Sequence, residues 1–134
     1  MIKKIIATLL LPIGVLAQNN QGFSISGSIT GLKDSTLVFL TDGVSGTAIA
    51  QDYAMNGKFV ITGKIDEPSI HKLSFTGIKD EVDLFFGNDK MNISGSTTKL
   101  TKPVITGSKL QNEYDAYIKS FNPLRDKLNA LVTK

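Results

Sequence analysis

Few residues in this sequence combine a type and a spacing that could support chemistry. His71 is the single histidine, and the chain of 134 residues contains no cysteine. A histidine can act as a general base or bind a metal, but either role needs a partnered nucleophile, a carboxylate or further ligands. No such partner stands at a suitable spacing from His71 in the sequence. By alternation His71 shares one face of a predicted strand with Leu73 and Phe75. The pattern therefore favours a histidine that covers the rim of a hydrophobic core.

Three short segments carry carboxylates that could bind a cation, namely DGVSG at 42–46, DEVD at 80–83 and GNDK at 87–90. A calcium loop needs alternating oxygen ligands and a closing glutamate, which the first and third segments lack. We interpret them as solvated hairpin tips and the DEVD segment as an acidic turn. From the sequence we assign no catalytic residue, no cofactor-binding residue and no metal ligand.

An Ile-Ser/Thr-Gly triplet occurs four times, at 25–27, 61–63, 93–95 and 105–107. A phosphate-binding loop needs clustered glycines ahead of a helix, because several backbone N–H groups must converge on the anion. Strand or turn follows the first three triplets, and Gly107, which does precede a helix, stands alone. The intervals are also too irregular for a repeat architecture. We therefore expect these glycines to permit a bulge, a bend or a close backbone approach in strands.

Residues 1–17 have the organisation of a secretory signal peptide. The basic start MIKK precedes a short apolar run, and Val15 and Ala17 are of the kind that signal peptidase prefers. We expect cleavage after Ala17 and a periplasmic or secreted protein that meets the membrane only through this segment. An uncleaved anchor and a buried helix are the alternatives, but Pro12 and Gly14 interrupt the run.

The basicity of the chain comes mostly from this leader. The whole sequence has 15 basic and 12 acidic residues, and Lys3 and Lys4 are removed with the leader. No basic cluster remains that could neutralise a row of phosphates, so nucleic-acid binding is disfavoured. The absence of cysteine excludes disulfides, a lipid anchor on an N-terminal cysteine and thiol chemistry in this chain.

Between residues 18 and 107 the pattern predicts a mainly β domain, an antiparallel sandwich-like fold of about eight short strands. In the first strand, apolar residues and Gly27 share one face, and a polar face is formed by Ser24, Ser26, Ser28 and Thr30. Residues 35–41 are apolar on both faces, which is typical of a central strand. Adjacent Phe85 and Phe86 must point to opposite faces of their strand.

The Asn56-Gly57 dipeptide predicts a two-residue hairpin turn. In that hairpin Phe59 should pair with Ala54, and Ile61 should pair with Asp52.

Residues 108–134 predict a helical connector. Ser108 fits an N-cap, and Gln111 could reach back to complete a capping box. The first apolar stripe consists of Leu110, Tyr114, Tyr117, Ile118 and Phe121. We expect Asn122 and Pro123 to interrupt the helix, and a second stripe follows with Leu124, Leu128, Leu131 and Val132. Both tyrosines should pack on the sheet. The stripe still runs at Lys134, which predicts a connector cut before a missing domain.

In order, the segments FSISGSITGL, STLVFL, QDYAMNGKFVITGKIDEP, HKLSF, DLFFGNDKMNISG and VITGSKLQNEYDAY resemble a known arrangement. It is the uncharacterised N-terminal β domain of exported thioredoxin-like, peroxiredoxin-related thiol–disulfide oxidoreductases of Bacteroidetes-type bacteria. The resemblance covers residues 22–121. It implies an accessory β domain, a helical connector and then a thioredoxin-like domain with a Cys-x-x-Cys site. That last domain is absent here, so no redox residue can be placed.

The resemblance implies a non-catalytic domain that positions the tethered redox domain or contacts other envelope proteins. The chain itself would not be an enzyme, although the full-length protein would be one. The alternative is a free-standing exported binding or adhesion module whose serine-rich face meets glycan hydroxyls. The absence of tryptophan counts against a glycan platform. The partner and the oligomeric state stay open at this point.

Overall fold

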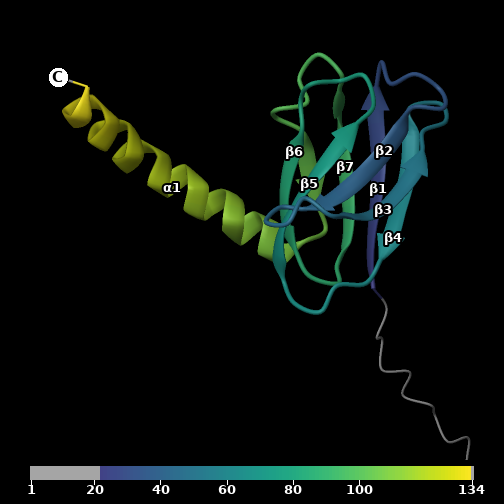
Figure 1. Ribbon diagram of the computed structural model, residues 1–134, viewed down its shortest axis with the longest axis horizontal. Coiled ribbons are helices and arrows are strands. Elements are labelled where there is room, and N and C mark those ends of the chain that lie inside the picture. The colour runs from purple at the N-terminus through teal and green to yellow at the C-terminus, as the bar shows by residue number, and fades with distance from the viewer. Residues whose placement is uncertain (1–21, 134) are drawn as a thin grey trace, which may run out of the picture.

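A computed structural model of the protein describes residues 22–133, which form two four-stranded sheets and one long helix (Figure 1). The first sheet has the order β4 (Lys58–Gly63), β1 (Phe23–Thr30), β7 (Lys90–Ser96) and β8 (Val104–Thr106). The second has the order β3 (Ala48–Tyr53), β2 (Leu37–Asp42), β5 (Ser69–Phe75) and β6 (Val82–Phe86). The helix α1 (Lys109–Val132) follows. The expected mainly β fold with a helical tail is confirmed. The expected signal peptide lies outside the described residues.

The two sheets pack face to face around a single hydrophobic core. The inward-facing residues that fill it include Phe23, Ile25, Ile29, Val38, Leu40, Phe59, Ile61, Leu73, Phe75, Leu84, Phe86, Met91 and Ile93. Two edge-to-face aromatic pairs join the sheets, Phe23 with Phe86 at 5.2 Å and Phe59 with Phe75 at 5.9 Å between ring centroids. Such pairs stabilise the folded state beyond the free energy gained by burying their apolar surface. The shared core therefore holds the two sheets together as a single domain.

Strand alternation follows the expected pattern. In β1 the apolar positions are buried and the serine and threonine positions lie on the outer face. Strand β2 lies between β3 and β5, as its apolar composition on both faces predicts. All pairings are antiparallel except that of β1 with β7, which is parallel.

The predicted hairpin turn is confirmed, but the predicted strand pairing across it is wrong. Asn56 and Gly57 have φ values of 53° and 75°, which the turn requires. After one bridge, Met55 to Lys58, the two strands separate into different sheets, and Ile61 pairs with Ile25 of β1 instead of Asp52. The separation buries Phe59 and Ile61 between the sheets.

Asp52 supports the hairpin where the strands part. Its carboxylate accepts a hydrogen bond from the Val60 backbone N–H at 2.8 Å, in place of a ladder bond.

The helix α1 is continuous, so the predicted interruption at Asn122 and Pro123 is wrong. Pro123 lies inside a helix of 24 residues. It has no N–H to donate to the carbonyl one turn earlier, and the helix tolerates this loss. The N-cap is confirmed, because Ser108 Oγ accepts from the Gln111 N–H at 3.1 Å. Over residues 22–133, no helix is both long and apolar enough to cross a membrane.

Candidate functional site

His71 lies in the core and not at its rim. Its side chain is 1% exposed, and its ring centroid lies 4.5 Å from that of Phe86. Nδ1 lies 3.0 Å from the Ser69 carbonyl oxygen, which favours the tautomer with the proton on Nδ1. Burial lowers the pKa of His71 below its ordinary value of 6.5, although the Ser69 carbonyl and the charge of Asp42 act in the opposite direction. The neutral imidazole is therefore favoured in the folded protein.

The strand register brings two further groups to His71. Asp42 pairs with His71 across β2 and β5, and Ser69 Oγ lies 3.4 Å from His71 Nε2. Serine, histidine and aspartate are the residue types of a hydrolase triad, in which the carboxylate holds Nδ1. Here the Ser69 carbonyl holds Nδ1, and the Asp42 carboxylate accepts instead from the N–H groups of Val44 and Ser45 at 2.9 and 2.7 Å. The hydrogen bonds of this cluster therefore differ from those of a triad.

The sequence alone did not reveal this grouping. Asp42 and His71 are far apart along the chain, and only the pairing of β2 with β5 makes them neighbours. The hydrogen bonds from Ser45 and Val44 hold the pKa of Asp42 below its ordinary value of 3.8. The segment 42–46 is thus a turn closed by its own aspartate, as expected of a hairpin tip.

The segment 87–90 does more than the expected solvated tip. The Asn88 amide accepts from the Ile65 N–H at 3.1 Å and donates to the Ile65 carbonyl at 2.9 Å. Asp89 accepts from Ser108 Oγ at 2.9 Å. This turn therefore connects the β4–β5 loop to the start of α1. No group of three potential metal ligands occurs in the described part of the chain.

The four triplet glycines lie in strands or directly after one and do not gather into a phosphate site. Gly107 adopts φ 91°, and a Cβ there would lie 2.4 Å from the Lys90 carbonyl oxygen. Gly27 and Gly63 face phenylalanine rings of the neighbouring strand. These glycines allow close approach, as predicted.

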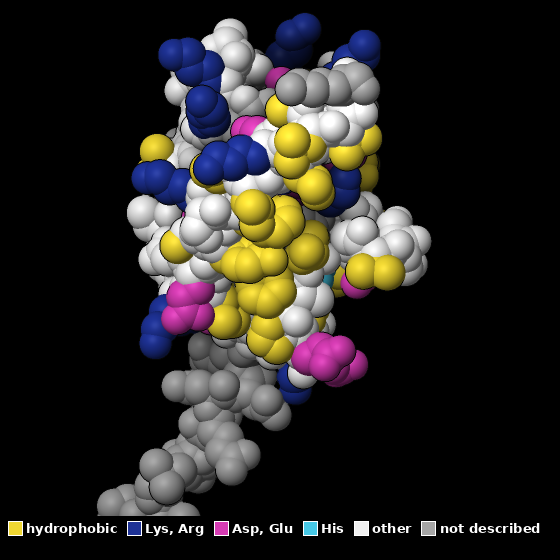
Figure 2. Space-filling view, turned by 90° about the vertical axis from the view of Figure 1, so that its left-hand side faces the viewer, with side chains coloured by type: hydrophobic (Ala, Val, Ile, Leu, Met, Phe, Trp, Pro, Cys, Tyr) yellow, Lys and Arg dark blue, Asp and Glu magenta, His cyan; other side chains and the backbone are white. Residues whose placement is uncertain are grey.

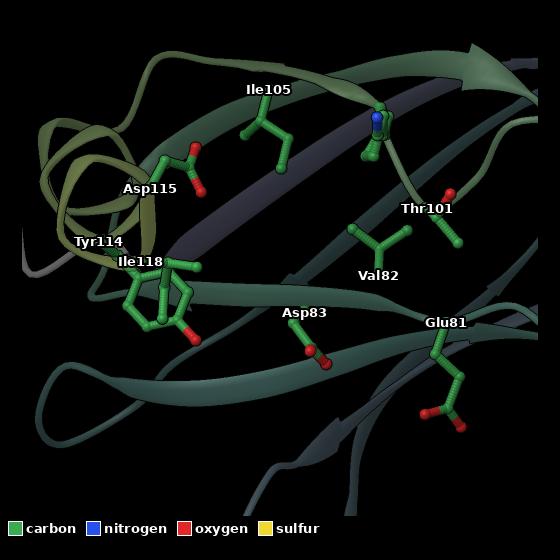
Figure 3. Close-up of a pocket in the computed structure, with 10 residues that line it drawn as sticks. Glu81, Val82, Asp83, Thr101, Ile105, Tyr114, Asp115 and Ile118 are labelled. Atoms are coloured by element: carbon green, nitrogen blue, oxygen red, sulfur yellow. The ribbon is translucent and has the colours of Figure 1, made fainter. Parts of the chain in front are cut away.

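A groove of about 500 Å³ opens where the edge strands β6 and β8 border the first turns of α1 (Figure 3). Its apolar lining includes Val82, Ile105, Tyr114 and Ile118. Its acidic lining consists of Glu81, Asp83 and Asp115, and Lys102 supplies a positive charge. The groove is therefore apolar on the side of the helix and the edge strands, with acidic side chains along its border.

Gln111 attaches α1 to the edge of β6. Its Oε1 accepts from the Phe85 backbone N–H at 2.7 Å, and its Nε2 donates to Asp115 Oδ1 at 2.8 Å. The side chain therefore does not complete the predicted capping box. It takes the place of a neighbouring strand at β6, and it is 1% exposed. A buried amide with both ends bonded fixes the first turn of the helix on the sheet.

Aromatic packing also holds the start of α1 on the sheet. We call this start, residues 108–114, the root of the helix. Tyr114 stacks on Phe85 with ring centroids 5.5 Å apart, as expected, while Phe86 points into the core. Tyr117 does not pack on the sheet: it is 60% exposed and stacks on Phe121 within the helix. The prediction for Tyr117 is wrong because α1 leaves the sheet after its first turns (Figure 1).

Apolar side chains follow one another along one side of α1, half-buried at the root and open to solvent beyond it. We call this set the α1 stripe: Leu110, Tyr114, Tyr117, Phe121, Leu124, Leu128 and Leu131. Leu124, Leu128 and Leu131 are each at least 60% exposed. Figure 2, which views the side from which α1 projects, shows hydrophobic side chains gathered in a band down this face. Single exposed apolar residues are ordinary on a monomer, whereas a large continuous apolar patch is uncommon.

The fold is thus a small two-sheet sandwich with an attached, projecting helix and exposed apolar side chains along that helix. The sequence of residues 23–114 matches the family described as Domain of unknown function (DUF4369), and the chain belongs to that family. The match takes in all eight strands and the root of α1. No curated protein is significantly similar to the chain.

Proposed function

We propose that this chain is an exported, non-catalytic accessory domain that positions a thioredoxin-like redox domain through α1. The observation that carries the proposal is the fixed root of the helix. Gln111 bonds to Phe85, Ser108 bonds to Asp89, and Tyr114 stacks on Phe85. A helix held in this way moves with the sheets and transmits their orientation to whatever is attached to it.

The length of α1 supports a positional role. Its 24 residues span about 36 Å at 1.5 Å per residue, which exceeds the reach needed to cover one sheet edge. A rigid arm of this length restricts a tethered domain to a small volume and so sets its effective concentration near a bound partner. The groove beside the root offers a place for such a partner on the same side of the sandwich.

The redox part of the proposal rests on the sequence resemblance. The ordered landmarks from residue 22 to residue 121 resemble the accessory domain of exported thioredoxin-like oxidoreductases. Family membership carries no activity, since the family has no assigned function. The periplasmic or secreted location rests on the leader-like composition of residues 1–17.

The first test is the intact mass and the free-thiol count of the native product, recovered from its own cell envelope. A product longer than this cysteine-free chain, carrying two redox-active thiols, is the expected result. A native product without cysteine would overturn the oxidoreductase assignment.

The second test loosens the root in that native product. Gln111→Ala removes the bond to Phe85, and Asn112→Ala alters an exposed neighbour as the matched control. We expect Gln111→Ala to slow thiol–disulfide exchange with protein substrates and to leave exchange with a small disulfide unchanged. Equal rates with protein substrates for both variants would contradict a positioning role.

The outer face of the first sheet supports a second candidate, an exported glycan-binding module. On this face the hydroxyls of β1 lie beside Asn92, Ser94 and Ser96 of the parallel strand β7. Hydroxyl and amide groups in rows can bond to sugar hydroxyls, although the outward positions of β1, β4 and β7 include no aromatic ring. Binding of the purified chain on a glycan array, lost in Ser26→Val, would favour this module.

A further inference from the structure

The α1 stripe repeats with the period of a coiled coil. Its members follow one another at alternating intervals of four and three residues, from Leu110 to Leu131 without a break. This is a heptad repeat, in which Tyr114, Phe121 and Leu128 take position a, and position d is taken by Leu110, Tyr117, Leu124 and Leu131. A straight helix drifts by about 20° per heptad from this repeat, so a stripe that only covers a globular surface has no need to keep it. The repeat favours a second helix as the occupant.

The rest of α1 agrees with a seam along this stripe. Pro123 takes position c, on the outer side of the helix, so its ring does not enter the seam. Tyr117 and Phe121, at the centre of the stripe, are 60% and 43% exposed and already stack on each other. Exposed aromatic rings in the middle of a heptad seam are placed to fill the central layers of a helix pair.

The charges beside the seam indicate which helix fits and in which direction. Glu113 and Lys127 both take position g, and their side chains are exposed. In an antiparallel pair of identical helices, the g positions of the two copies face each other across the seam. Glu113 of each copy then meets Lys127 of the other, and the two Ser120 residues meet at the centre. A parallel pair would oppose g to e, which gives Ile118 opposite Glu113 and Val132 opposite Lys127.

The ion pair that Glu113 makes with Lys109, both within the described residues, does not compete strongly with this arrangement. Lys109 Nζ lies 3.9 Å from Glu113 Oε1, and both side chains are largely exposed. Such surface pairs contribute little to stability and exchange readily with a new partner.

The sheets also favour the antiparallel direction. At the root the seam side of α1 lies against β6, where Tyr114 stacks on Phe85. A parallel pair would bring two whole sandwiches to this end. An antiparallel pair brings only a helix tip there.

We propose that the α1 helices of two copies of this chain pair as an antiparallel coiled coil, with Glu113 of each copy opposite Lys127 of the other. The interface goes beyond the proposed function and does not depend on it. It would place the two sandwiches at opposite ends of one helical rod.

The first experiment measures the mass of the purified chain by sedimentation equilibrium over a range of concentrations. A dimer is expected. Leu124→Asp should give a monomer, and Ala130→Asp, which adds the same charge on the outer side of the same helix, should stay dimeric. A monomer at every concentration would overturn the proposal, and so would equal dimerisation of both variants.

The second experiment reads the direction of the helices without a variant in the core. Because the chain has no cysteine, Glu113→Cys and Lys127→Cys each carry one thiol that a short bis-maleimide can join. After the two variants are equilibrated together, crosslinks between Cys at 113 and Cys at 127 should dominate. Dominant crosslinks between identical positions would indicate a parallel pair and overturn the assignment.

A charge exchange provides the last check. Glu113→Lys or Lys127→Glu alone should weaken dimerisation several-fold, and the double variant should recover it. A double variant as weak as the sum of the two singles would contradict the pairing of these residues. A native product without redox thiols would overturn the proposed function and leave the dimer intact, whereas a monomeric chain would do the reverse.

Discussion

Gly27 and Phe59 lie opposite each other in the β1–β4 pair, and the phenylalanine ring occupies the space above the glycine. A Cβ at position 27 would lie 2.0 Å from Phe59 Cζ. The same relationship recurs four residues along the sheet, where Phe23 faces Gly63 and a Cβ there would lie 2.7 Å from its ring. In two of the four Ile-Ser/Thr-Gly triplets, the glycine therefore leaves space for a phenylalanine ring of the neighbouring strand.

Gly27→Ala should destabilise the domain by about 1–3 kcal/mol, the usual cost of forcing extra volume into a packed core. Gly95→Ala is the matched control, because it lies in another triplet and its nearest neighbour atom would be 3.6 Å away. Chemical denaturation of both variants measures the difference. A compensating Phe59→Leu should recover part of the loss in Gly27→Ala. Equal stability of the two alanine variants would show that the ring moves aside without cost.

Gln111→Ala should leave the Phe85 N–H without its partner at the edge of β6. An unsatisfied buried donor costs about 1–3 kcal/mol, and here the loss should appear as local opening of the helix root. Hydrogen exchange of the Phe85 amide should accelerate, with the amides of β1 unchanged. The control Asn112→Ala should leave both rates as in the parent chain.

Pro123→Ala distinguishes a continuous helix from two helices. In a helix interior, proline is about 3 kcal/mol less favourable than alanine, so the substitution should raise helicity and slow amide exchange around residue 119. At the first position of a second helix, proline is favourable, and its replacement would lower helicity. Circular dichroism of the purified chain gives the sign directly.

The stability of the domain should fall as the pH drops below the ordinary histidine pKa of 6.5. Because burial lowers the pKa of His71 in the folded state, the unfolded chain binds the proton first. The stability conferred by neutral His71 is therefore complete above pH 6.5 and is lost as the pH falls toward the folded pKa. The contribution of Asp42, whose pKa lies below 3.8, is lost only at lower pH.

Denaturant titrations at several pH values should show this loss in the parent chain and not in His71→Leu. The two proteins should differ in slope between about pH 7 and pH 5, the window in which a free histidine titrates. Parallel pH dependences would assign the titration to another group.

Period-two alternation was enough to predict the strands, because each strand buries one face against a single core. The alternation in residues 23–30 and the apolar run of residues 35–41 gave both the inward faces and the central place of β2. The same local logic located the N-cap at Ser108. These features depend on neighbours in sequence, which is why the sequence contains them.

The partners of each strand could not be predicted in this way. The Asn56-Gly57 turn indicates that two strands meet. The strands that carry Asp52 and Val60 nevertheless enter different sheets, because this arrangement buries Phe59 and Ile61 in the core. The contact of Gln111 with Phe85 and that of Asp42 with His71 also join residues distant in sequence. In α1, the expectation of a break at Pro123 concealed the single heptad repeat that runs across it.

The place of β1 has a consequence for how the domain folds. Strand β1 is the first of the strands to be synthesised, but its neighbours in the sheet are β4 and β7. The parallel pair of Ser24 with Lys90 can therefore form only after Lys90 has been synthesised. Pairings between such distant segments slow folding, because the chain loses the entropy of a long loop before the contact forms. The first sheet therefore forms only when nearly the whole domain has emerged. A chain that emerges N-terminus first stays unfolded until most of the domain is present.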